Sequence, residues 1–134
     1  MTGPQIQLFV DRTGAGYNWR LLAANNRETG RGTSLHLDER ACRDEIRRLQ
    51  CASHRLVARA RRASLGRWSW ELALDDVVVA ASTHTFDRMI RCEQVVATVA
   101  ARLAAAPIAA GVIDSGLRRR TASIRPTPRL GEFV

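Results

Sequence analysis

The sequence predicts an α+β protein in which a unit of three strands and one helix occurs twice. A short motif is repeated: residues 16–21 read Gly-Tyr-Asn-Trp-Arg-Leu, and residues 66–72 read Gly-Arg-Trp-Ser-Trp-Glu-Leu, about 51 residues later. Each copy lies in a region where apolar and polar residues alternate, as in half-buried strands. Each region is followed by one with apolar residues at helical spacing. At 134 residues, the chain is long enough for a single modest core.

The first unit begins with two predicted strands. Ile6, Leu8 and Val10 alternate with polar residues, which is the period-two pattern of a strand with one buried face. A turn with two glycines follows, and residues 17–23 then alternate in the same way. Two such runs on either side of a short turn predict a hairpin.

Asn25-Asn26 predicts a tight two-residue turn after the second strand, because Asn tolerates the left-handed backbone that such turns require. A third strand is expected over residues 29–35. Gly30 and Gly32 weaken its strand character.

The first helix is predicted to begin after Asp38, whose side chain suits the N-cap position. The apolar residues on one face of this helix are Ala41, Cys42, Ile46 and Leu49. The other face is charged, with acid–base pairs such as Glu39 and Arg43 four residues apart. Such pairs are typical of a solvated helix face.

The second unit repeats this order. Strands are expected over residues 56–61, 68–74 and 77–82, and the last of these is strongly β-branched. Asp75-Asp76 occupies the place of the hairpin turn, where Asp is expected for conformational reasons.

A second helix is expected to begin near Thr85 or Asp87, and Pro107 ends it. Its buried face comprises Met89, Cys92, Val96, Val99 and Leu103. A short strand is predicted near residues 108–113. Residues 116–134, rich in arginine with two prolines, predict a flexible basic C-terminal tail.

This pattern resembles the YegP-like family of small bacterial and archaeal proteins. In the first copy the resemblance is carried by Phe9, Asp11, Gly14, Tyr17, Trp19, Leu21, Ala23-Ala24-Asn25 and Ile46. In the second copy it is carried by Gly66, Trp68, Trp70, Leu72, Ser82, Phe86 and Val96. It covers about residues 5–106. Asn26 departs from the family, which usually has glycine there.

The resemblance implies one domain over residues 1–115, made of two repeats at about 5–55 and 56–106. Both repeats would join into one antiparallel sheet with two helices packed on one face. Terminal strands would be exchanged between the halves, and residues 108–113 would close the sheet. The family has no established enzymatic activity, so the resemblance implies no catalytic residue.

The formal charge is +8, and all 21 basic residues are arginines. A basic surface favours an anionic partner, such as nucleic acid or an acidic protein. Complete replacement of Lys by Arg is also what a coding bias in the genome would produce. The sequence leaves both explanations open.

The candidate anion or nucleic-acid contacts are arginines on the predicted strands, on the turn before the second tryptophan motif, and in the tail. They are Arg20, Arg59, Arg61, Arg62, Arg67, Arg118, Arg119 and Arg120. The alternation places Arg59 and Arg61 on the face away from Ala58, where they could contact phosphates. The alternative is that Arg20 and Arg59 pair with Glu71 across strands. The three tryptophans share a face with leucines and are expected in the core rather than on a stacking platform.

No catalytic, cofactor or metal site is expected. The three cysteines lack disulfide or metal spacing, and Cys42 and Cys92 are expected to be small buried core residues. His36 and His84 are expected in equivalent loops, where a metal or anion site is the alternative to plain exposure. The chain shows no signal peptide and no membrane span, which predicts a cytoplasmic protein without membrane association.

The sequence therefore favours a non-enzymatic binding or assembly module. The first expectation is protein–protein interaction or self-association, through sheet edges or through the sheet face without helices. The alternative is weak, sequence-independent nucleic-acid binding through the arginine-rich face and tail.

Overall fold

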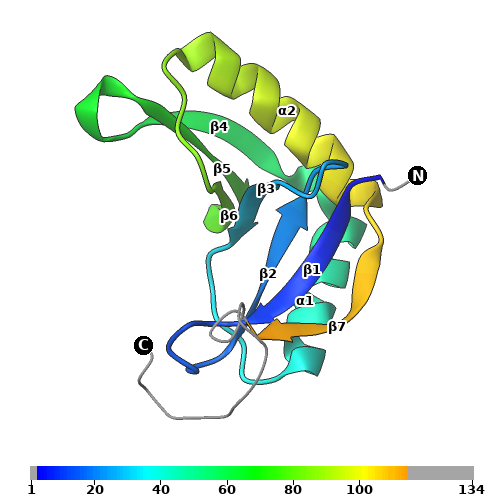
Figure 1. Ribbon diagram of the computed structural model, residues 1–134. Coiled ribbons are helices and arrows are strands. Elements are labelled where there is room, and N and C mark those ends of the chain that lie inside the picture. Colours follow the sequence, from blue (N-terminus) through cyan, green and yellow to red (C-terminus); the bar gives the residue numbers. More distant parts are fainter. Residues whose placement is uncertain (1–2, 115–134) are drawn as a thin grey trace.

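The computed structural model describes residues 3–114, which form one seven-stranded sheet and two α-helices (Figure 1). The strands are β1 (Gln5–Val10), β2 (Tyr17–Leu22), β3 (Glu28–Gly32), β4 (Val57–Arg62), β5 (Trp68–Leu74), β6 (Val77–Ser82) and β7 (Ile108–Asp114). The helices are α1 (Glu39–Cys51) and α2 (Met89–Ala105). The α+β class is confirmed, and the tail predicted over 116–134 lies outside the described residues.

The strand order is β4-β5-β6-β3-β2-β1-β7, so β3 and β6 meet at the centre. All neighbours are antiparallel except β1 and β7, which run parallel, so the prediction of an antiparallel sheet is wrong at this pair. β7 runs parallel to β1 because of the position at which α2 ends. Pro107 lies beside the start of β1, and the Ile6 N–H donates to its carbonyl at 2.9 Å. The two strands therefore leave the same end of the sheet in the same direction.

Both helices lie on one side of the sheet (Figure 1). α1 contacts β1 and β2, whereas α2 contacts β4 and β5. Cys42, Ile46 and Leu49 of α1 are fully buried, and Cys92, Val96, Val99 and Leu103 of α2 are at most 3% exposed. The prediction that Met89 shares this buried face is wrong, because Met89 is the first residue of α2 and is 45% exposed. Amphipathic periodicity thus orients both helices correctly, and the two cysteines are core residues as predicted.

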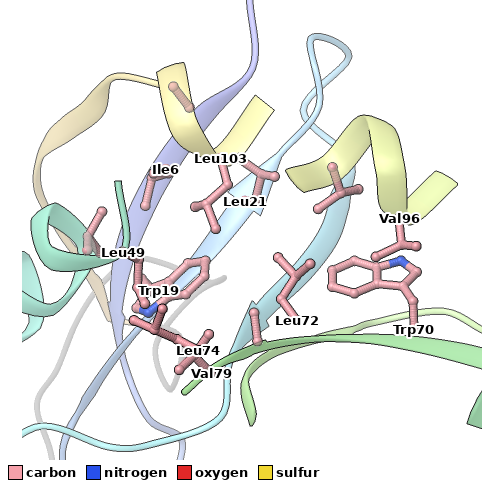
Figure 2. Packing of buried hydrophobic residues seen from close by; sticks show 14 of the residues in the cluster. Ile6, Trp19, Leu21, Leu49, Trp70, Leu72, Leu74, Val79, Val96 and Leu103 are labelled. Carbon is pink, nitrogen blue, oxygen red and sulfur yellow. The ribbon is translucent and has the colours of Figure 1, made fainter. Parts of the chain in front are cut away.

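The core lies between these helices and the sheet (Figure 2). Its largest members are Trp19 and Trp70, each 2% exposed, surrounded by aliphatic side chains from both halves of the chain. Trp68 is only partly buried, so the expectation that all three tryptophans are core residues is wrong for this one.

The two hairpin turns differ. Asp75 and Asp76 both have positive φ (52° and 68°) and join β5 directly to β6, which confirms the predicted two-residue turn. The prediction of a two-residue turn at Asn25-Asn26 is wrong. Residues 23–27 form a longer loop in which only Asn26 has positive φ, and the Asn25 side chain accepts a hydrogen bond from the Arg27 N–H. A register shift at the end of β2 accompanies the longer loop.

Helix starts follow the local hydrogen bonds. Asp38 caps α1 as predicted, because its side chain accepts from the Ala41 N–H at 2.8 Å. α2 begins at Met89, later than predicted, because Phe86 remains extended and exchanges two backbone hydrogen bonds with Trp68. Arg88 is its N-cap residue and makes no side-chain capping bond.

Two other element boundaries shift. β3 ends at Gly32 and not at 35, because His36 bonds the Tyr17 backbone instead of continuing the strand. The first strand of the second unit is displaced by one residue, to Val57–Arg62. No helix within residues 3–114 is long and apolar enough to cross a membrane.

Candidate functional site

The sheet face without helices, here called the open face, carries a row of polar side chains. Residues paired directly across strands share a face, and the observed register aligns one residue from each of six strands. From β1 to β4 these residues are Gln7, Arg20, Arg31, Ala81, Glu71 and Arg59, all of them polar except Ala81. The row includes two of the sequence-predicted arginines, Arg20 and Arg59, which share this face but lie four strands apart.

Arg20 is neutralised within its own half of the sheet. Its guanidinium contacts Glu28 at 3.3 Å and donates from Nε to Gln7 Oε1 at 2.8 Å. Arg31 binds the same Glu28 through two nitrogens, at 2.7 and 2.9 Å. Both guanidiniums lie over the ring of Phe9, with Cζ 5.7 and 4.9 Å from its centroid. The prediction that Arg20 pairs with Glu71 is therefore wrong, because Arg20 and Glu71 lie three strands apart.

Glu71 is the second anionic centre of the open face, and the residue is only 7% exposed. Arg59 donates from Nε to Oε2 at 2.8 Å, and Arg61 donates to Oε1 at 3.2 Å. The predicted alternative is thus correct for Arg59. Burial raises the pKa of Glu71. The hydrogen bonds and positive charges of Arg59 and Arg61 lower it by more than burial raises it, so the net shift is downward. The pKa of Glu28 is lowered in the same way, against its burial, by Arg31, Thr83 and Arg20.

The other predicted arginines do not join this row. Arg67 binds Thr85 and Asp87 in the loop before α2. Arg62 lies on the helix side, with Cζ 5.3 Å from the centroid of Trp68, and no carboxylate among residues 3–114 binds it. Arg118, Arg119 and Arg120 lie outside the described residues. Within residues 3–114 the predicted arginines therefore lie in three places, the open face, the helix side beside Trp68 and the loop before α2, and they do not form one surface.

β4 forms one edge of the sheet, and its outward backbone groups have no partner among residues 3–114. The N–H and C=O of Trp68 both bond Phe86, at 2.8 and 2.7 Å, so they point away from Arg62, its opposite residue on β4. In an antiparallel pair, hydrogen-bonded and non-bonded positions alternate. The outward-pointing groups are therefore those of Ala58, Ala60 and Arg62. No residue within 3–114 binds any of them.

The opposite edge, β7, is protected. Arg43 of α1 donates to the carbonyls of Ala109 and Gly111, at 3.3 and 3.2 Å. Gly111 has a φ of +80°, and the register with β1 shifts at this point, which is a bulge-like irregularity. Bulges and inward-directed charges are two ways in which proteins prevent further strand pairing. The sequence indicated Arg43 only as the partner of Glu39, a pair that the structure also contains, at 2.9 Å.

The histidines and cysteines do not form a site. His36 uses its backbone to bond Tyr17, and His84 is exposed. Within residues 3–114 no group of three or more His, Cys, Asp or Glu side chains could hold a metal ion. Burial raises the pKa of the Cys42 thiol to about 11, which keeps it protonated and unreactive near neutral pH.

The fold is that of the YegP-like proteins. The solution structure of YegP from E. coli, a protein of unknown function, aligns with a TM-score of 0.63 over 84% of this chain and 96% of its own, at 15% identity. The UPF0339 protein SO3888 from Shewanella oneidensis aligns with a TM-score of 0.62 over 80% of this chain and 90% of its own, at 12% identity. No family model matches the sequence, and no curated protein matches it. At these identities the likeness concerns the fold alone.

Proposed function

We propose that this protein is a non-enzymatic interaction module that binds an extended segment of another protein along the outer edge of β4. The observation that carries the proposal is the row of backbone groups at Ala58, Ala60 and Arg62, which no other residue of the described chain (3–114) binds. An open edge of this kind pairs with an added strand, in which main-chain hydrogen bonds supply affinity and alternate side chains supply specificity.

An internal comparison supports this location. If the chain is a tandem repeat, β4 is the first strand of the second repeat and corresponds to β1. The matching features are the bridges Tyr17–His36 and Trp68–Phe86, and the buried cysteine of each helix. The outer edge of β1 is filled by β7, which comes from the other half of the chain. In this comparison, the position beside β4 that corresponds to the position of β7 beside β1 is open to a strand of another chain.

Self-association through β4 is disfavoured by its charges. Antiparallel pairing of two copies about Ala60 would set Arg59 of one copy opposite Arg61 of the other, on the same face. Like charges directly opposite each other destabilise a strand pair. We therefore propose a different protein as the partner.

Nucleic-acid binding is the second candidate, and the charge distribution favours it. Residues 115–134 contain five arginines and one glutamate, so half of the net charge of +8 belongs to one seventh of the chain. The arginines of the open face support it less, because Glu28 and Glu71 hold four of them. Binding of a generic RNA that weakens steeply with salt, and that is lost on removal of residues 117–134, would support this function.

The edge proposal is tested with Ala58→Pro, which removes an outward N–H without breaking a bond inside the sheet. Ala58 is exposed, and the preceding residue is already extended, as a proline requires. Ala58→Ser is the matched control, because it changes the side chain and retains the N–H. A displayed library of random linear peptides is selected on the wild-type protein, and the enriched peptides are then measured on both variants.

We expect the enriched peptides to bind the wild type and Ala58→Ser equally and to lose at least tenfold affinity for Ala58→Pro. Amide chemical shifts should change along β4. Equal binding to all three proteins would reject the edge as the binding site, as would failure to enrich any peptide. Circular dichroism spectra and melting temperatures of the three proteins show whether the proline variant is folded.

A further inference from the structure

β4 carries more positive charge than the neighbouring carboxylate offsets, which favours a negatively charged partner. Arg59 and Arg61 share the single carboxylate of Glu71, and their side chains are 52% and 63% exposed. A guanidinium has five N–H donors, and each of the two donates one bond to Glu71. Arg62 adds a third positive charge that no carboxylate among residues 3–114 offsets. Positive charge and N–H donors that nothing within residues 3–114 uses therefore line the same strand as the outward backbone groups.

The side chains of β4 also have a definite spacing. Val57, Arg59 and Arg61 alternate with alanines and so point to the open face, with about 6.8 Å between successive members. Val57 is 55% exposed despite being apolar. A strand added beside β4 would place one side chain opposite each of these three residues, with Cβ atoms about 5 Å apart.

Resting on the edge-binding function above, we propose that the segment bound by β4 is an acidic strand. On its open-face side it presents one apolar residue and two carboxylates at every second position. The apolar side chain covers Val57, and the carboxylates bind the free N–H donors of Arg59 and Arg61. Ion pairs of this kind also explain the selectivity of the edge, because a second copy of β4 would bring arginine and not carboxylate to these positions.

The ligand is tested with synthetic peptides, so that the protein itself is unchanged. The acidic peptide T-V-T-E-T-E-T-V-T has the same pattern in both directions and therefore fits a parallel or an antiparallel strand. A neutral peptide replaces both glutamates with glutamine. A rearranged peptide, T-V-T-E-E-T-T-V-T, keeps the composition but places the two acids on opposite faces. Titrations followed by amide chemical shifts measure each affinity at low and at high salt.

The acidic peptide should bind about fivefold tighter than the neutral one at low salt, as expected for two partly exposed ion pairs. The difference should shrink as salt rises. The rearranged peptide should bind between the two. Ala58→Pro should abolish binding of the acidic peptide, and Ala58→Ser should not.

The possible failures are distinguishable. If the neutral peptide binds as tightly as the acidic one and Ala58→Pro abolishes both, the acidic preference is overturned while edge binding stands. The same holds if none of the three peptides binds but library-selected peptides do bind at β4. If the acidic peptide binds Ala58→Pro as tightly as the wild type, the arginines bind it without strand addition, and both proposals fail.

Discussion

Gly30, at the centre of the sheet, is expected to be intolerant of even one added methyl group. A Cβ at this position would lie 2.3 Å from Cη2 of Trp70 and 2.7 Å from the carbonyl oxygen of Ala81. Trp70 has little room to move, because it is 2% exposed and lies next to Val96 of α2 (Figure 2). Its buried indole N–H has no partner within residues 3–114, so packing alone holds the ring.

Overpacking of this kind costs about 1–3 kcal/mol of unfolding free energy. Replacing Gly by Ala also restricts the unfolded chain, which returns roughly 0.4–1 kcal/mol. Together these ranges allow a net loss of up to about 2.6 kcal/mol. Because the added methyl would meet both the Trp70 ring and the Ala81 carbonyl, we expect a loss of about 2 kcal/mol, or a fall in melting temperature of about 7–8 °C for a domain of this size.

Thermal unfolding and urea titration measure this loss. Gly3→Ala is the control, because a Cβ there meets nothing within 4 Å. The double variant Gly30→Ala, Trp70→Leu tests the cause, since a smaller side chain at 70 should reduce the cost of Gly30→Ala by at least about 1 kcal/mol. A melting temperature within 2 °C of the wild type, or the same cost in both backgrounds, would refute the reasoning.

Three further predictions concern helix ends, the protected edge and acid stability. Asp38→Ala should destabilise the protein by about 1 kcal/mol, and Arg88→Asp should stabilise it by a similar amount by capping α2, both by urea unfolding. Arg43→Ala should increase hydrogen exchange of β7 amides while leaving those of β4 unchanged; equal increases at both edges would contradict its local role. Because the pKa values of Glu28 and Glu71 are lowered by folding, their contribution to stability is fully present above about pH 4.3 and lost as pH falls through the folded values. Glu71→Gln should flatten the dependence of unfolding free energy on pH in this acid range, and an unchanged slope would contradict the assignment.

Local periodicity predicts the strands, the helices and most of the faces that they bury, with Trp68 and Met89 as exceptions that are more exposed than their patterns predict. The alternation around Trp19 and Trp70 and the helical spacing around Cys42 and Cys92 each depend on a few neighbouring residues. The same is true of the Asp38 cap. These features could be read from the sequence because their cause is local.

Features that depend on strand order could not be predicted in this way. The choice of Glu28 over Glu71 as the partner of Arg20 follows from which strands adjoin, and nothing near Arg20 in the sequence encodes it. Gly30 made β3 look like a poor strand, yet the structure shows that its missing side chain makes room for Trp70. Arg43 had the pattern of a solvated helix pair, but it also reaches the carbonyls of a strand 66 residues away.

The contrast between the two edges of the sheet supports the proposal that β4 binds a strand of another protein. If avoiding aggregation were the only requirement, a bulge or a capping side chain such as Arg43 at β7 would meet it and would also satisfy the backbone. In β4, Arg59 of one copy would face Arg61 of another if two copies paired about Ala60, while the small side chains of Ala58 and Ala60 leave the outward backbone groups accessible. This combination would disfavour pairing with a second copy of β4, but it would still allow a strand with different side chains to pair there. Under the proposed function, such an edge would favour a strand of opposite charge over a second copy, since specificity combines attraction to one partner with repulsion of another.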